Sequence, residues 1–345
     1  MNKKLLHTVL FAWFRKHGRI LPWRMRELSA LHKAKKISKT KVSVLRDSTI
    51  ASYFTTKWNR DPYTIIVSEL MLQQTQVDRV LPKFESFIRK WPTVHDLSKA
   101  KLSEVLIEWK GLGYNRRAKF LHEMAHAVVH THKGNFPKTE EELRKLSGVG
   151  EYTARAVLTF AYGKDIGVVD TNIRRIFSRV MFGKEAGQVD ISTKEFFAVI
   201  DQSVPRGKGD PWNQALMDFG ALVCTAKAPK CDVCPLQTVC IANLSEQKHG
   251  FRNYAENYAD SLATKNKKIN IKKSGAKKIP FKQADRYFRG KVIDILRDGH
   301  QHMEKLYQQV ERDHKLRDKK RWGNIIESLM IDGLIAIRGS TVSLA

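Results

Sequence analysis

The stretch LSGVGEYTARAVLTFAYGKDIGVVDTN, residues 146–172, decides the fold that we expect for this chain. It predicts the end of one helix, a tight turn at Gly148-Val149-Gly150, a second helix with apolar residues at helical spacing, and a short apolar run that ends at Asp170. The two glycines allow a sharp turn and leave amide N–H groups uncovered at a helix start, which suits a phosphate oxygen. Taken alone, the same residues are also typical of a structural turn and of a helix cap at Asp170.

The composition favours a polyanionic partner. Lys and Arg number 62 against 35 Asp and Glu in 345 residues, a formal net charge of +27. Such an excess predicts binding that weakens steeply with salt. The first helix, near residues 5–14, has an apolar stripe and no small-residue cleavage site after it, which indicates a core helix of an intracellular protein. No apolar run is long enough to span a membrane, so we expect no membrane partner.

The chain divides into three predicted parts. Residues 1–244 read as a helical body, interrupted at 25–59 by an irregular basic stretch that we interpret as a surface insertion. Residues 245–280 are a basic linker. Residues 281–345 predict three short helices, at 287–296, 303–310 and 322–329, followed by a two-stranded hairpin from Gly333. That outline fits a winged helix, and it fits a small packing or dimerisation domain equally well.

All four cysteines lie close together, with the spacing Cys224-x6-Cys231-x2-Cys234-x5-Cys240. Two disulfides are unexpected in an otherwise cysteine-free helical protein of this kind. Four thiolates on one short loop instead favour a metal site, and their spacing alone suits zinc or a [4Fe–4S] cluster.

Taken together, several motifs resemble the helix-hairpin-helix (HhH-GPD) DNA glycosylases that carry an iron–sulfur cluster, and among them the adenine DNA glycosylase branch. The resemblance covers residues 5–243 apart from the insertion. The motifs that carry it are LPWR (21–24), DPY (61–63), SELMLQQTQV (68–77), GLGY (111–114), LSGVGEYTA (146–154), VVDTN (168–172), ALMDFGALVC (215–224) and the four cysteines. It implies an all-α, two-lobed HhH-GPD fold, with a [4Fe–4S] cluster on Cys224, Cys231, Cys234 and Cys240.

Two acids are the candidate catalytic residues. Breaking a base–sugar bond needs an extruded nucleotide, an acid for the leaving base and a carboxylate facing the developing oxocarbenium ion. Glu69 is predicted to share a helix face with Leu72, Gln73 and Gln76. Its apolar neighbours in sequence favour burial, which would raise its pKa, over the alternative of a solvated carboxylate. The resemblance implies that Glu69 protonates adenine at N7, while Asp170 stays ionised and stabilises the sugar cation.

The resemblance also implies roles for residues around these acids. Asn172 and Tyr152 would support Asp170 and line the pocket, and a phenol at position 152 cannot form a Schiff base, which predicts base removal without efficient strand cleavage. Trp23 and Asp218 would lie near the base, although Trp23 could equally be ordinary core. The residues expected to contact or wedge into DNA are Leu72, Gln73, Gln74, Thr75, Tyr114, Gly148 and Gly150; Tyr114 alone could also be a core tyrosine at a helix break.

The resemblance, together with these residues, implies a monofunctional DNA glycosylase of base excision repair that removes adenine mispaired with guanine or 8-oxoguanine from double-stranded DNA. We expect a monomer in the cytoplasm of a prokaryote, associated with the nucleoid. The chain departs from the branch at Thr171 and Asn115, and its C-terminal part replaces the Nudix-like domain usual in that branch. One alternative is therefore a thymine or uracil glycosylase for T:G or U:G mismatches, and another is a DNA-structure-binding regulator without catalysis.

Overall fold

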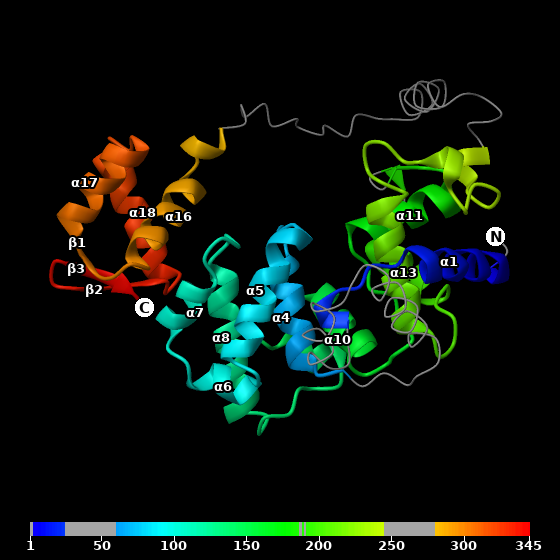
Figure 1. The fold of residues 1–345 in the computed structure, drawn as a ribbon, viewed down its shortest axis with the longest axis horizontal. Coiled ribbons are helices and arrows are strands. Elements are labelled where there is room, and N and C mark those ends of the chain that lie inside the picture. Colours follow the sequence, from blue (N-terminus) through cyan, green and yellow to red (C-terminus); the bar gives the residue numbers. More distant parts are fainter. Residues whose placement is uncertain (1–2, 25–59, 186–187, 190, 245–279) are drawn as a thin grey trace, which may run out of the picture. The chain divides into compact units, whose positions relative to one another are not determined.

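The computed structural model describes residues 3–24, 60–185, 188–189, 191–244 and 280–345, which form two compact units (Figure 1). The first unit comprises residues 1–62 and 151–273, and the second comprises residues 63–150 and 274–345. The predicted insertion at 25–59 and nearly all of the predicted linker lie outside the described residues. The predicted division at 244 and 280 stays a prediction.

The first unit is helical in its described part. Its elements are α1 (Lys3–His17), η1 (Pro22–Arg24), α10 (Glu151–Phe160), α11 (Thr171–Phe182), α12 (Thr193–Asp201), α13 (Gly209–Leu222) and η3 (Cys231–Val233). The apolar stripe of α1 packs on α13, which in turn packs on α11. Leu10, Phe14 and Phe219 are fully or almost fully buried in this core. The predicted N-terminal core helix is therefore present, and its burial accounts for the apolar stripe in the sequence.

The second unit begins with six helices from residues 62–144. They are α4 (Pro62–Leu72), α5 (Val77–Lys90), α6 (Val94–Lys99), α7 (Leu102–Glu108), α8 (Arg116–His130) and α9 (Glu140–Arg144). The spacing of apolar residues over 96–109 predicts one amphipathic helix, but the structure has two, because the chain leaves the helix at Ala100 and starts α7 at Leu102. Thr93 caps α6 through a reciprocal hydrogen-bond pair with Asp96, and the Glu104 side chain accepts from the N–H of Lys101 at the start of α7.

The last part of the second unit is a small three-helix domain with a sheet. Its helices are α16 (Asp285–Leu296), α17 (Met303–His314) and α18 (Lys319–Ile331), preceded by η4 (Phe281–Gln283). The predicted hairpin is present as β2 (Ile335–Arg338) paired antiparallel with β3 (Thr341–Leu344), in the register Ile335 to Leu344. A two-residue strand, β1 (Gln301–His302), adds to the other side of β3. That third strand was not predicted, because two residues carry no alternating pattern.

This C-terminal domain packs on helices α7 and α8 within the second unit (Figure 1). The Arg297 guanidinium donates to the carbonyl of Leu106 at 2.9 Å and to Oδ1 of Asn115 at 3.0 Å. Lys119 Nζ donates to the carbonyl of Asp332 at 2.7 Å. The domain is therefore attached through buried polar contacts beside the GLGY turn.

Across the described ranges, none of the helices combines the length and the apolar character that a membrane crossing requires.

Candidate functional site

The Gly148-Val149-Gly150 turn is built as the sequence predicts. Val149 is buried and donates its N–H to the carbonyl of Leu146 at 3.1 Å, and α10 begins at the next residue after Gly150. Gly148 has a φ of +75°, and a Cβ there would lie 2.7 Å from Cβ of Phe120. Within the described residues the N–H groups of Gly148 and Gly150 donate to no other group. They are open donors at a helix start, the property expected of a phosphate site.

Glu69 lies in the last turn of α4 and is buried, with 7% of its surface exposed. The alternative of a solvated carboxylate is therefore wrong. Val67, Leu70 and Met71 are also buried, as their apolar character predicts. The burial expected of Glu69 and of its apolar neighbours is therefore present in the structure.

The helix that carries Glu69 is shorter than expected. It ends at Leu72, and Gln74 adopts a φ of +56° in the turn that follows. Gln73 still donates its N–H to the carbonyl of Glu69 at 3.2 Å, but the prediction that Gln76 continues the face of Glu69 is wrong, because Gln76 is the extended N-cap of α5. The carbonyl groups released at this helix end are bound by a side chain from α8.

That side chain is Arg117, which the sequence reasoning missed. Its Nη1 donates to the carbonyls of Leu70, Met71 and Gln73 at 2.6–3.0 Å, and its Nη2 donates to Thr75 Oγ1 and to the carbonyls of Leu112 and Gly113 at 2.9–3.1 Å. Burial lowers the pKa of Arg117 to about 10, so the guanidinium still carries its charge at neutral pH. One buried cation thus holds both turns expected to wedge into DNA, residues 72–75 and 111–114.

Tyr114 lies on the surface of the second of these turns. It is 50% exposed and has a φ of +46°, and the Arg117 guanidinium lies 5.6 Å from its ring centre. The alternative of a core tyrosine is therefore wrong. Leu72, Gln73 and Thr75 are partly exposed and Gln74 is exposed, so these predicted contact residues are accessible.

Asp170 is the N-terminal cap of α11 in the first unit. Its Oδ1 accepts from the N–H of Ile173 at 2.7 Å, and its Oδ2 accepts from Nδ2 of Asn172 at 2.8 Å. Burial raises the pKa of Asp170, and these hydrogen bonds with the nearby charge of Arg175 oppose the rise in part. The predicted cap and the predicted contact with Asn172 are confirmed, while the sequence did not reveal the desolvation of the carboxylate. Tyr152, on α10 in the same unit, is partly buried.

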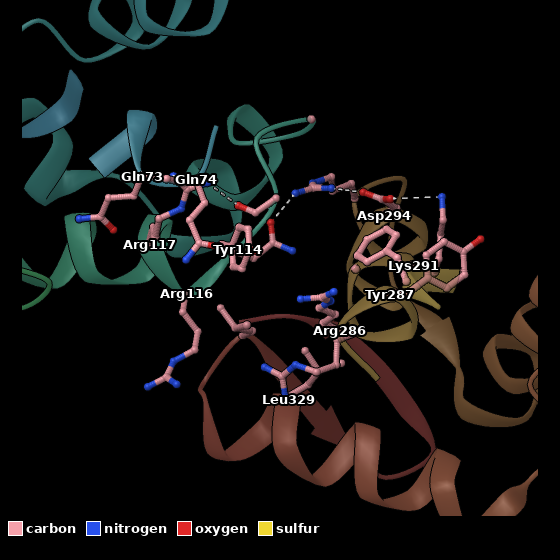
Figure 2. Close-up of a pocket in the computed structure, with 18 of the residues that line it drawn as sticks. Gln73, Gln74, Tyr114, Arg116, Arg117, Arg286, Tyr287, Lys291, Asp294 and Leu329 are labelled. Carbon is pink, nitrogen blue, oxygen red and sulfur yellow. Dashed lines mark hydrogen bonds and ion pairs between the residues drawn. The ribbon is translucent and has the colours of Figure 1, made fainter. Parts of the chain in front are cut away.

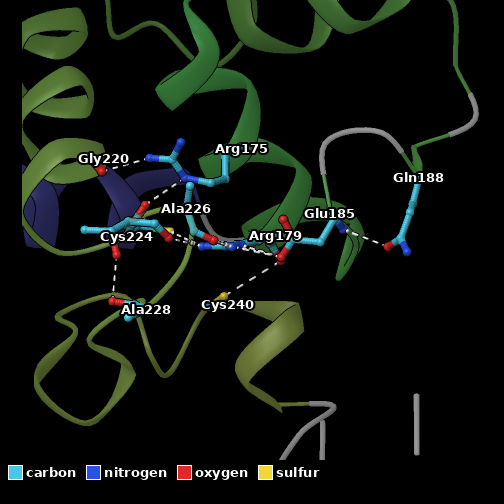
Figure 3. A network of polar contacts seen from close by, with 10 residues as sticks. Arg175, Arg179, Glu185, Gln188, Gly220, Cys224, Ala226, Ala228 and Cys240 are labelled. Atoms are coloured by element: carbon cyan, nitrogen blue, oxygen red, sulfur yellow. Dashed lines mark hydrogen bonds and ion pairs between the residues drawn. The ribbon is translucent and has the colours of Figure 1, made fainter. Parts of the chain in front are cut away.

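A second arginine, Arg175, connects the residues that hold Asp170 to the start of the cysteine loop; Figure 3 shows its contacts with Gly220 and Cys224. Arg175 Nη2 donates to Oδ1 of Asn172 at 2.9 Å and to the carbonyl of Gly220 at 2.8 Å, and Arg175 Nε donates to the carbonyl of Cys224 at 2.9 Å. The chain of contacts therefore runs from Asp170 through Asn172 and Arg175 to the first cysteine. Arg175 was also missed, because an arginine within a helix carries no motif of its own.

Trp23 and Asp218 are both buried in the first unit. Asp218 has no exposed surface, and its carboxylate accepts from Arg19 and Arg24 at 2.7–2.9 Å. Burial alone would raise the pKa of Asp218, but its ion pairs with Arg24 and Arg19 outweigh that effect and lower it. In this structure Asp218 ties η1 to α13, and its predicted contact with the base stays a prediction.

The four cysteines surround one small pocket at the end of α13, together with Val180, Phe219 and Arg179. None of them, all within the described residues, forms a disulfide. Burial, followed by the neighbouring thiols, raises the pKa of Cys234 to about 11. Thiolates here need positive charge nearby, because four of them repel one another in a buried place.

The protein supplies some of that charge. Arg179 Nη1 donates to Sγ of Cys224 at 3.6 Å (Figure 3). The N–H of Leu236 donates to Sγ of Cys234 at 3.4 Å. No set of three or more His, Cys, Asp or Glu side chains in the described ranges is arranged to hold a single metal ion. Four cysteines around one pocket with no disulfide between them, and with hydrogen-bond donors to two of the sulfur atoms, fit an iron–sulfur cluster.

Comparison with known proteins places both regions in one family. The model for the HhH-GPD superfamily of base excision DNA repair proteins matches residues 67–199, and that for the iron–sulfur binding domain of endonuclease III matches residues 224–240. The four cysteines are therefore the [4Fe–4S]-binding motif of this chain, and zinc is set aside. A solved structure of a thermostable thymine-DNA glycosylase is similar with a TM-score of 0.57 and 27% identity, over 70% of this chain and 97% of that one.

Among curated relatives, the adenine DNA glycosylase of Mycolicibacterium smegmatis is 35% identical over 281 residues, which are 81% of this chain and 86% of the relative. The adenine DNA glycosylase of Mycobacterium tuberculosis is 37% identical, over 66% of this chain and 65% of the relative. The human adenine DNA glycosylase is 36% identical, and this chain spans 38% of its length. The chain belongs to the adenine DNA glycosylase family, within the HhH-GPD superfamily of base excision DNA repair proteins.

Proposed function

We propose that the protein hydrolyses the N-glycosidic bond of adenine mispaired with guanine or 8-oxoguanine in double-stranded DNA, and leaves the strand intact. The observation that carries this proposal is the presence of two acids at the motif positions, Glu69 buried in α4 and Asp170 held by the N–H of Ile173 and by Asn172 at the start of α11. Glycosidic cleavage uses two carboxyl groups with different tasks. The names of the relatives support adenine as the base.

In the proposed reaction Glu69 donates its proton to the leaving adenine while the bond from the base nitrogen to C1′ breaks. The electron pair of that bond leaves with the base, and the carboxylate of Asp170 stabilises the positive charge that develops on the sugar. Water then forms the new bond at C1′ and gives its proton to the Glu69 carboxylate, so the product is an abasic site and the acid is restored. Tyr152 offers no amine for a covalent imine, which accounts for an intact strand.

Binding is proposed to combine three features of this chain. The open N–H groups of Gly148 and Gly150 take one phosphate. The turns held by Arg117 enter the base stack, with Tyr114 and Leu72 filling the space that the extruded nucleotide leaves. The cluster, when bound, holds the loop from Cys224 to Cys240 together. The protein is proposed to act as a monomer, in the cytoplasm of a prokaryote.

The test is a panel of duplexes that contain A:G, A:8-oxoguanine, T:G or U:G, incubated with the full chain and then treated with alkali. We expect alkali-dependent cleavage at adenine in the first two duplexes, and none without alkali. Glu69→Gln and Asp170→Asn should each abolish the product while duplex binding, measured by anisotropy, persists. Loss of binding together with activity would show that the altered acid is structural.

A second candidate is removal of thymine or uracil, which the similarity to a thymine-DNA glycosylase supports. Product from T:G or U:G alone in the same panel would replace adenine by that substrate. No product from any duplex, with binding retained, would favour a DNA-structure-binding regulator.

A further inference from the structure

The C-terminal domain and the turns held by Arg117 enclose a pocket of about 630 Å³ within the second unit (Figure 2). We call it the α16 pocket. One wall consists of residues 73–74 and 111–120, and the other consists of α16 with Phe281, Leu329 and Leu334. Its volume lies within the roughly 300–1,000 Å³ of sites for small ligands. The proposed catalytic acids do not line it.

The pocket is strongly basic. It is lined by six cations, Arg116, Arg117, Arg286, Arg289, Lys291 and Arg297, against one acid, Asp294. Some of these cations are held by the protein itself: Arg117 by the turns, Arg297 by Asp294, Leu106 and Asn115, and Arg289 by Ser328 and Asp332.

Arg286 differs from these cations because no described carboxylate or carbonyl oxygen holds its side chain. Its guanidinium lies over the ring of Phe281 at 5.2 Å and forms no ion pair with a carboxylate in the part of the chain that the structure describes. Arg116 lies on the opposite wall, and its side chain is 58% exposed. Among the described residues it pairs with one carboxylate, that of Asp332, with 3.5 Å between Nε and Oδ1. The pocket thus keeps positive charge available for an anion on both walls.

Two aromatic rings are exposed beside these cations. Phe281 is 58% exposed in η4, and Tyr114 is 50% exposed on the opposite wall. Exposed rings next to arginines are the means by which proteins bind unpaired bases, because any base can stack on a ring while its phosphate pairs with the cation.

A glycine on the α16 wall points to close approach by a ligand. Gly290 lies in the interior of α16, where glycine is less favourable than alanine by about 1 kcal/mol. A Cβ at Gly290 would meet no atom within 4 Å, so nothing in the described chain requires a glycine there. The absent side chain leaves the helix backbone open to the pocket.

We propose that the α16 pocket binds one unpaired nucleotide of DNA, with its base against Phe281 and its phosphate on Arg286 and Arg116. This inference rests on the proposed function for the presence of DNA. Its geometry is independent of the catalytic acids. The exposed rings and the uncharged amides of Gln73 and Gln74 favour a nucleotide over an acidic peptide, which would use the cations alone.

The test measures fluorescence anisotropy with the full chain carrying Asp170→Asn, so that no base is removed. The probes are a labelled duplex with a single unpaired thymidine and the same duplex fully paired. We expect Phe281→Ala and Arg286→Ala each to weaken binding of the first probe about fivefold or more, and to change binding of the second less than twofold. Arg312→Ala, which removes an equally charged and exposed side chain from α17, is the matched control and should change neither.

Gly290→Leu is a second test of the pocket in case Phe281→Ala or Arg286→Ala unfolds the protein. Leucine favours a helix more than glycine does, so the thermal midpoint should not fall, yet its side chain would occupy the pocket and weaken binding of the unpaired thymidine. Unlabelled oligothymidylate should compete with that probe, whereas polyglutamate should not.

Equal losses on both duplexes would overturn the proposal in favour of a contact to ordinary duplex backbone. Efficient competition by polyglutamate would overturn it in favour of an acidic protein segment. Unchanged binding in all three pocket variants would leave the pocket without this role. An inactive wild-type chain whose pocket variants still lose the unpaired nucleotide would refute only the proposed glycosylase activity.

Discussion

Arg117 in the second unit and Arg175 in the first are both buried arginines that bind backbone carbonyls, but they connect different parts of the protein. Arg117 binds six oxygen atoms from two turns and joins surface loops to each other. Arg175 binds three oxygen atoms, one of which belongs to the side chain of Asn172, itself a donor to Asp170.

The difference indicates what each unit has to keep rigid. The second unit presents turns with left-handed residues, whose carbonyls no helix can satisfy, so one cation with a fixed fork of donors replaces regular structure. The first unit has a helix cap that already fixes Asp170, and its arginine adds a connection from that cap to the cluster loop. If this contrast is correct, removing the two arginines should have effects of different kinds and sizes.

The largest effect is expected for Arg117→Met. Methionine fills part of the volume but leaves five carbonyls and a hydroxyl without their shared donor. The free energy of unfolding should fall by at least about 3 kcal/mol, because a buried acceptor without a partner costs about 1–3 kcal/mol. Chemical denaturation followed by circular dichroism measures this change.

Arg117→Lys should recover only part of the loss, since an ammonium has three donors for six acceptors. Arg144→Met, on an exposed part of α9, is the control and should change stability by no more than about 0.5 kcal/mol. Equal stability of Arg117→Met and wild type would show that water replaces the arginine in these turns.

Arg175→Met is expected to have the next largest effect. It removes hydrogen bonds to Asn172, Gly220 and Cys224, which corresponds to about 2 kcal/mol of stability. Unlike Arg117→Met, it should also lower the iron bound per chain and the single-turnover rate of base removal. Iron analysis and that rate are the measurements. A stability loss with full iron content and full rate would mean that Arg175 is only a packing residue.

The sequence predicted the helical body, the cysteine loop and the hairpin turn, because each of these depends on local spacing. The apolar stripe of α1 and the glycines at 148 and 150 are such signals, and so are the four cysteines. Glu69 and Asp170 were identified through motifs, and the apolar residues around Glu69 predicted its burial, whereas the desolvation of Asp170 had no signal in the sequence.

The contacts of Arg117, Arg175 and Arg297 could not be predicted, since each joins residues that lie far apart in the chain. Arg117 and Leu70 are 47 residues apart, and Arg297 and Leu106 are 191 apart. The end of α4 at Leu72 was missed for the same reason, because the side chain that binds its last carbonyls comes from α8. The α16 pocket likewise depends on how two distant segments pack.

A smaller effect is expected at the turn that contains Gly148 and Gly150. Gly148→Ala should destabilise the protein by about 1–2 kcal/mol, because alanine is strained at a φ of +75° and its Cβ would press on Phe120. Gly150→Ala meets open space at an ordinary φ, so its thermal midpoint should stay close to that of wild type. If the open amides bind phosphate, Gly150→Ala should weaken duplex binding without loss of stability. Equal destabilisation by the two variants would remove the distinction between a glycine needed for folding and one that leaves room for a ligand.

The smallest expected effect is a gain in stability for Asp170→Asn in the first unit. Burial raises the pKa of Asp170 in the folded chain above its value in the unfolded chain. The folded state therefore binds this proton more readily, and the stability that this provides is complete below the unfolded pKa and is lost as the pH rises through the folded pKa. Wherever Asp170 is ionised, the folded wild type holds a desolvated charge, whereas asparagine can cap α11 without one. Thermal midpoints from pH 4 to pH 8 should show the Asp170→Asn variant gaining on wild type as the pH increases, and base removal should be lost by about 100-fold or more throughout. A stability difference independent of pH would mean that the hydrogen bonds from Ile173 and Asn172 fully offset the burial of the carboxylate.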